Sequence, residues 1–114
     1  MTFLFWIKVL IAVATLGFGA MSIVSPAAAE RFTGLSAAGP RGVSEIRAVL
    51  GGLFVGLAIA VLIYRTSSAF GTLGIGYLGI AFVRAASIFA DQAATTSNWV
   101  SLGSELLFGV LLLV

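Results

Sequence analysis

The sequence predicts an all-α integral membrane protein, an up-down bundle of four transmembrane helices in a single domain over residues 1–114. Hydrophobic residues make up 61% of the chain and charged residues only 9%, whereas a soluble domain carries about 25% charged residues. The apolar residues fall into runs close to the roughly 20 residues that span a bilayer. Short polar connections between the later runs favour sequential antiparallel neighbours.

The first predicted helix covers residues 3–24, and its one charge, Lys8, lies near its start. A lysine there extends its long stem toward the headgroups. Pro26 follows directly and ends the helix, because proline lacks the N–H that the hydrogen-bond ladder needs.

The alanines at 27–29 resemble a signal peptidase site, which would leave a mature protein of three helices. The apolar run before them is about 22 residues long, however, and a signal peptide core is about 7–15. No basic segment precedes the run. We therefore expect the N-terminal segment to be retained as a transmembrane helix.

Residues 25–43 hold both prolines of the chain and are expected to form an irregular interfacial loop. The second helix is predicted over 44–64. Ser44 is a favourable N-cap there, and Glu45 lies in the first turn, where a carboxylate suits the positive end of the helix dipole.

The third helix is predicted over 67–90 and the fourth over about 99–114. The third follows a tight polar turn after Tyr64, and a short polar connection joins the third to the fourth. The fourth helix is short for a membrane span.

The second helix carries small residues at every fourth position, beside a further glycine at Gly51, and such a ridge lets another helix approach closely in lipid. Two interpretations stay open, packing within the bundle and docking of another subunit. The third helix offers glycines on more than one face. The ridge consists of Ala48, Gly52, Gly56 and Ala60.

Polar residues of the third and fourth helices predict a charged cluster near one end of the bundle. At about 100° per residue, Tyr77, Arg84 and Asp91 share one face of the third helix. Asn98, Ser101 and Glu105 share one face of the fourth. Arg84 and Glu105 are each about two turns from the connection, so they should lie at similar depth. The full intramembrane cluster is Glu45, Arg47, Arg84, Asp91 and Glu105.

This cluster has a structural and a functional interpretation. An ion pair of Arg84 with Glu105 would fix the register of two helices, with Asp91 and Glu45 completing the network. Alternatively, the cluster is a polar pocket for a ligand headgroup or for protons, because ionisable residues within a membrane mark functional sites.

The residue inventory excludes several functions. The chain has no cysteine and no histidine, so thiol chemistry, iron–sulfur clusters and imidazole ligation of metals or haem are excluded. We expect no metal and no cofactor. No basic stripe indicates nucleic-acid binding.

Residues 45–52, with the pattern E-x-R-A-x-x-G-G, resemble the signature of the DUF4345 family, a bacterial family of small four-helix membrane proteins without an established activity. Pro26 after the first helix, Arg84 with Asp91 in the third and Glu105 in the fourth also match. Leu50 departs from the pattern, which often has an aromatic residue before the first glycine. The resemblance implies a multi-pass protein of the bacterial inner membrane.

The leading functional hypothesis is a non-catalytic accessory or stabilising subunit, with the lipid bilayer and other membrane subunits as partners. The alternative is binding or transport of a small lipophilic or proton-coupled ligand at the charged end. A lipid-like or pigment-like ligand would be held mainly by apolar contacts. A membrane enzyme ranks third, because no histidine is present to activate a serine.

Overall fold

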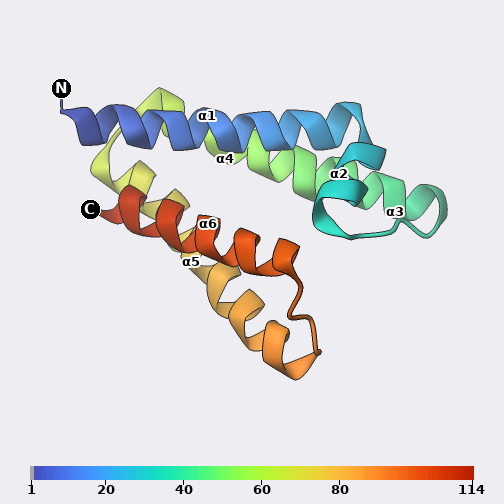
Figure 1. The fold of residues 1–114 in the computed structure, drawn as a ribbon. Helices are drawn as coiled ribbons and strands as arrows, with labels where there is room; N and C mark the ends of the chain where they lie inside the picture. Colours follow the sequence, from blue (N-terminus) through green and yellow to red (C-terminus); the bar gives the residue numbers. More distant parts are fainter. Residues whose placement is uncertain (1) are drawn as a thin grey trace. The chain divides into compact units, whose positions relative to one another are not determined.

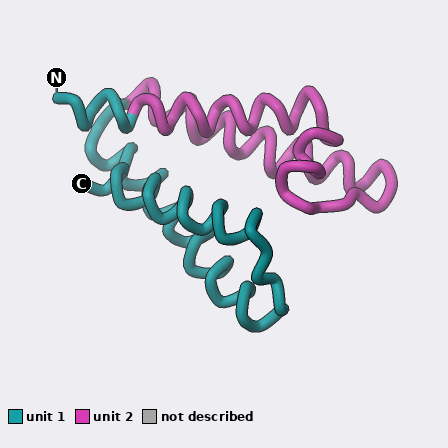
Figure 2. The backbone as a smooth tube through the Cα atoms, viewed as in Figure 1, with its two compact units in different colours: residues 1–8, 65–114 teal, residues 9–64 magenta. Residues whose placement is uncertain are grey.

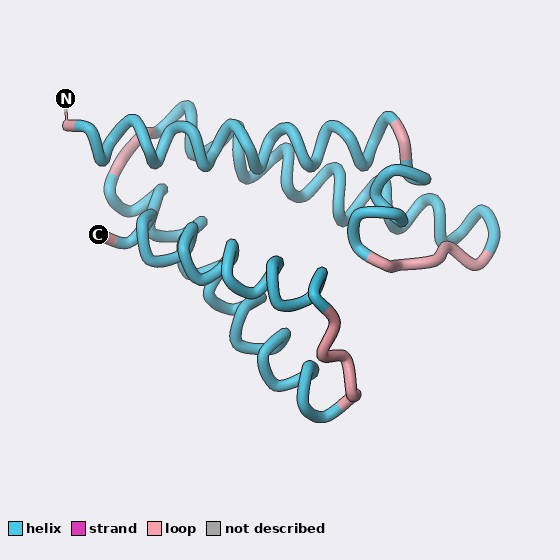
Figure 3. The backbone as a smooth tube through the Cα atoms, in the orientation of Figure 1, coloured by secondary structure: helices cyan, strands magenta, loops and turns pink. Residues whose placement is uncertain are grey.

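The fold of residues 2–114, described by a computed structural model, is helical, and this range contains no strand. Figure 1 shows the helices, and Figure 3 shows the short connections between them. In chain order the elements are α1 Phe3–Val24, α2 Pro26–Thr33, α3 Gly39–Glu45, the π-helix η1 Ile46–Leu53, α4 Phe54–Tyr64, α5 Ser67–Ala90 and α6 Thr96–Leu113.

Four of the described helical stretches are long and apolar enough to cross a membrane. They are Phe3–Val24, the continuous stretch Gly39–Tyr64 formed by α3, η1 and α4, then Ser67–Ala90 and Thr96–Leu113. The predicted class, an all-helical protein with four membrane spans, is confirmed. The chain is therefore a multi-pass membrane protein.

The described chain divides into two compact units, shown in Figure 2. One consists of residues 9–64 and is called the N-terminal unit below. The other consists of residues 65–114 with residues 1–8 and is called the C-terminal unit. A single domain over 1–114 stays a prediction, and each unit is described by itself.

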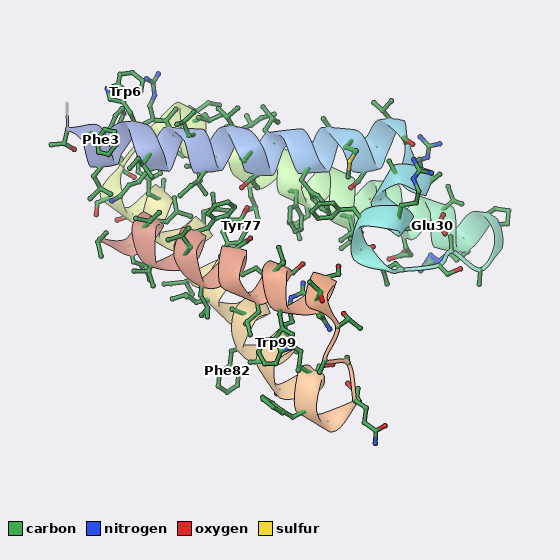
Figure 4. All side chains as sticks on the ribbon, in the orientation of Figure 1. Phe3, Trp6, Glu30, Tyr77, Phe82 and Trp99 are labelled. Atoms are coloured by element: carbon green, nitrogen blue, oxygen red, sulfur yellow. The ribbon has the colours of Figure 1, made fainter. Side chains whose placement is uncertain are left out.

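The predicted irregular loop over 25–43 is wrong in its first and last parts, which are helical, and only residues 34–38 between them are irregular. Ser25 caps α2 by accepting a hydrogen bond from the Ala28 N–H at 3.3 Å, and Pro26 occupies the first turn, where its missing N–H costs nothing. Gly34 ends α2 with φ of 81°, a left-handed conformation that suits glycine. The Glu30 carboxylate, labelled in Figure 4, then accepts from the Ala37 N–H at 3.2 Å and closes the short loop.

The predicted start of the second membrane helix at Ser44 is also wrong. The helix begins at Gly39, five residues earlier, with Pro40 in its first turn. Proline is pre-organised for that position because its φ is fixed near the helical value. Ser44 and Glu45 consequently lie inside the continuous helix, and the dipole argument for Glu45 fails.

The fourth helix starts at Thr96, three residues before the predicted start. Thr95 is the N-cap and accepts from the Asn98 N–H at 3.2 Å. The resulting 18 residues give a length of about 27 Å, close to the hydrocarbon thickness of about 30 Å. The apparent shortness of this span came from placing its cap too late.

In the N-terminal unit, α1 and the stretch η1–α4 run antiparallel (Figure 1) and approach through two glycines. A Cβ atom on Gly19 would lie 2.9 Å from the Gly51 carbonyl oxygen, and a Cβ on Gly51 would lie 3.2 Å from the Gly19 carbonyl oxygen. The two backbones thus touch without intervening side chains. This is the close approach that small residues allow between membrane helices.

The predicted ridge on the second helix does not form this contact. Ala48, Gly52 and Gly56 are exposed, and a Cβ on Gly56 would meet open space. The π-helix explains this difference. Its hydrogen bonds join residues five apart rather than four, so each hydrogen-bonded ring contains one residue more than in an α-helix. Ile46 and Gly51, five residues apart, are therefore both buried.

In the C-terminal unit, α5 and α6 form an antiparallel pair that also meets at glycines. A Cβ on Gly74 would lie 3.0 Å from the Gly109 carbonyl oxygen, and a Cβ on Gly109 would lie 3.2 Å from the Gly74 carbonyl oxygen. Nearer the connection, the two helices share an apolar core. It consists of Ala81, Ile88 and Leu102, with Ala85 packed against it.

Candidate functional site

The predicted pair of Arg84 and Glu105 is formed, and it joins α5 to α6. Arg84 Nε donates to Glu105 Oε1 and Nη2 donates to Oε2, each at 2.8 Å. The Glu105 side chain is only 12% exposed and that of Arg84 is 30% exposed. Two parallel bonds from a planar guanidinium to a carboxylate are strong and directional. The predicted ion pair therefore joins the two helices by a directional contact, and its structural and functional interpretations both stay open.

Asn98 extends this pair to the connection between the helices. Its Oδ1 accepts from Arg84 Nη1 at 2.7 Å, while its Nδ2 donates to the Ala93 carbonyl at 3.0 Å. The amide thus links the guanidinium to the backbone just before α6. Thr95 positions Asn98, since its hydroxyl caps the helix at the Asn98 N–H.

A shallow, open groove of about 530 Å³ lies beside this pair on the surface of α5. One end is polar and contains Arg84, and the other is apolar and contains residues of the preceding α5 turn. We call it the Arg84 groove. It is lined by Gly79, Ile80, Val83, Arg84, Ser87 and Asn98.

The other residues predicted around Arg84 are placed differently. Asp91 accepts a 2.5 Å hydrogen bond from the Ser87 hydroxyl, one turn back in the chain. Tyr77 is half-buried and packs edge-on against Phe108, with ring centroids 5.5 Å apart. Ser101 is half-buried on α6. Of the predicted polar neighbours, Asn98 accepts a hydrogen bond from Arg84.

Glu45 and Arg47 belong to the N-terminal unit and have partners there. Glu45 pairs with Arg41 one turn earlier at 3.0 Å, and both side chains are exposed, so the pair adds little stability. Arg47 Nη1 donates to the Ile23 carbonyl. That carbonyl is among the last four of α1, which lack partners within their own helix, and a cation also suits the negative end of the helix dipole. One cluster of all five charges stays a prediction.

Sequence reasoning missed two features of this region. Ser87 was not singled out, although it lies one turn from both Arg84 and Asp91 on α5, and that spacing was a usable signal. The apolar end of the groove had no distinct signal, because Gly79, Ile80 and Val83 resemble every other lipid-facing stretch of the chain.

The chemistry of the site is hydrogen bonding and charge pairing. Among the described residues, no three acidic side chains gather to hold a metal ion. Every buried side-chain nitrogen and oxygen in that part of the chain has a hydrogen-bond partner. At the edge of the open groove, each of the three guanidinium nitrogens of Arg84 donates one hydrogen bond to Glu105 or Asn98.

A family model described as "Domain of unknown function (DUF4345)" matches residues 3–114, essentially the whole chain. The chain belongs to the DUF4345 family. The resemblance expected from Glu45, Arg47 and the two following glycines is therefore confirmed. No curated protein and no solved structure matches the chain.

The signature of this DUF4345 chain now has a structural setting. Glu45 is the last residue of α3 and residues 46–52 lie in the π-helix, where Arg47 bonds to the end of α1 and Gly51 forms the crossing with Gly19. Two residues of the signature, Arg47 and Gly51, thus join the two membrane helices of the N-terminal unit.

Proposed function

We propose that this DUF4345 protein is a non-catalytic accessory subunit of the bacterial inner membrane, which packs against a larger membrane complex. The observation that carries the proposal is the exposed strip of Ala48, Gly52 and Gly56 on the second membrane helix. Because α1 crosses this helix at Gly51, the strip is left open for a further helix. Small, exposed side chains let a further helix approach closely in lipid.

The chemical inventory of the chain supports the same proposal. The membrane-spanning residues include no histidine or cysteine, and Arg84 is already paired with Glu105. The connections leave little mass outside the four spans. Such a chain has far more helix surface for packing than groups for catalysis.

The test is purification of the tagged protein in mild detergent at native expression, in three forms. Gly56→Leu places a large side chain on the strip, at a position where a Cβ would meet open space. Gly17→Leu is the matched control in the same unit, because Gly17 is exposed and its Cβ also meets open space. We expect a stoichiometric membrane subunit to accompany wild type and Gly17→Leu but to be lost from Gly56→Leu. A lone chain in wild type would overturn the proposal.

A second candidate function is binding of a small lipophilic ligand in the Arg84 groove. It is favoured by the side chain of Arg84, which is 30% exposed and lines the groove even while it pairs with Glu105. A ligand of this kind would be held largely by apolar contacts, with one polar anchor. Its test is whether filling the groove at Gly79 removes a retained ligand.

A further inference from the structure

The Arg84 groove is amphipathic along its length. The apolar part consists of Gly79 and Ile80, about one turn before Arg84, and of Val83, which directly precedes it, while Arg84 and Ser87 form the polar part. A Cβ on Gly79 would meet open space, so this stretch of α5 is uncovered. A ligand that follows the groove therefore needs an apolar chain joined to a hydrogen-bonding group.

The guanidinium of Arg84 has donors to spare. Of the five N–H groups of an arginine, three make the bonds to Glu105 and Asn98. Two N–H groups therefore remain without a protein acceptor within the described chain. An unpaired donor is costly in the apolar surroundings of a membrane span, so an acceptor from outside the chain is favoured there.

The charges around the groove select a neutral acceptor. Glu105 already neutralises Arg84, and Asp91 holds the Ser87 hydroxyl at the polar end. Two carboxylates thus accompany one guanidinium. An anionic group would be repelled by this balance, whereas a carbonyl oxygen accepts hydrogen bonds without adding charge.

The position of Arg84 along α5 indicates where this carbonyl lies in the bilayer. Arg84 is six residues before the end of the helix at Ala90, which is about 9 Å at 1.5 Å per residue. The 24 residues of α5 give about 36 Å, some 6 Å more than the hydrocarbon core. Arg84 then lies about 6 Å inside the core, within reach of its boundary for a long side chain.

We propose that the Arg84 groove binds one membrane phospholipid, with an acyl-ester carbonyl accepting hydrogen bonds from Arg84 and the acyl chain lying along Gly79, Ile80 and Val83. Ester groups join the chains to the headgroup, so they occupy the same boundary region. This assignment rests on the second candidate function and names the ligand for it.

The test compares two zwitterionic phosphatidylcholines with the same chains, one ester-linked and one ether-linked, which lacks the carbonyls. Native mass spectrometry of the delipidated full-length protein measures how tightly each lipid is retained. Gly79→Leu fills the groove without touching Arg84. Gly76→Leu is the matched control, because it is exposed on the same helix and its Cβ also meets open space.

We expect wild type and Gly76→Leu to bind the ester lipid about tenfold more tightly than the ether lipid. A tenfold preference corresponds to the net free energy that hydrogen bonds to a charged donor contribute. In Gly79→Leu we expect the ester and ether lipids to be retained about equally. Equal retention of both lipids by wild type would overturn the assignment. A preference that follows an anionic headgroup, tested with phosphatidylglycerol, would do the same.

A lipophilic quinone serves as the second probe, and it distinguishes failure of the phospholipid assignment from failure of the second candidate function. If the quinone binds in a Gly79-dependent way while the ester lipid shows no preference, the groove is a ligand site and only the phospholipid assignment fails. If Gly79→Leu changes the retention of neither probe, the second candidate function fails as well.

Discussion

The two units of this chain solve the same packing problem with different polar contacts. In each unit an antiparallel helix pair meets at two glycines, Gly19 with Gly51 and Gly74 with Gly109. The C-terminal pair is then fixed by a side-chain ion pair, Arg84 with Glu105. The N-terminal pair is fixed by a side chain that reaches a helix end, Arg47 at the Ile23 carbonyl.

This difference shows how register is set in lipid. Apolar surfaces of neighbouring helices gain little by facing each other there, because lipid chains are equally apolar. Glycines permit a close approach, but they do not choose one approach among several. A directional polar contact makes that choice, and either a carboxylate or a helix end can supply the acceptor.

The largest expected effect comes from breaking the ion pair of the C-terminal unit. Arg84→Ala leaves Glu105, which is 12% exposed, without its partner, and should cost about 3 kcal/mol of unfolding free energy. The double change Arg84→Met with Glu105→Leu should cost about 1 kcal/mol or less, because it removes both charges together. SDS titration in detergent micelles, followed by circular dichroism, measures both variants. Full folding of Arg84→Ala with loss of a cellular function would contradict a mainly structural role.

The next effect tests the glycine crossing of the N-terminal unit. Gly19→Ala places a Cβ 2.9 Å from backbone atoms of Gly51 and Val55, so the two helices must separate, at a cost of about 1–3 kcal/mol. Gly17→Ala is the control on the same helix, and we expect it to be neutral or slightly stabilising. The same titration compares them. Equal stability of the two variants would show that the close approach at Gly19 is unimportant.

The smallest effect tests the contact of Arg47 with the end of α1. Arg47→Met removes the donor to the Ile23 carbonyl but keeps much of the apolar stem, and should cost about 0.5–1 kcal/mol because the side chain is exposed. Hydrogen exchange at the Ser25 amide, which donates to the Met21 carbonyl at 2.8 Å, reports fraying there. Faster exchange at that amide and unchanged exchange within α5 are expected. Unaltered exchange at Ser25 would argue against a capping role.

The sequence allowed the spans and one polar contact to be predicted. The bounds of α1 and α5 follow from long apolar runs that end at polar or proline-containing segments. The pairing of Arg84 with Glu105 followed from equal distance to a shared connection. Both arguments need only counting along a regular helix.

The helix contacts and the interfacial segment could not be predicted in the same way. Glycines occur on several faces of the second and third helices, so spacing alone did not select Gly51 or Gly74. The ridge of Ala48, Gly52 and Gly56 assumed an unbroken α-helix, and the π-helix changes that geometry. The helix α2 escaped prediction because a proline that ends one helix also suits the first turn of the next.

The π-helix has a consequence for how the family can vary in length. A π segment accommodates one residue more than the α-helix that would otherwise fill the same rise. A homologue lacking one residue between Ile46 and Leu53 would close this segment into an α-helix, with the residues on either side keeping their orientation toward α1. A single-residue gap at this segment would therefore mark the loss of the π-helix without a change in the surface that the flanking turns keep inside the N-terminal unit.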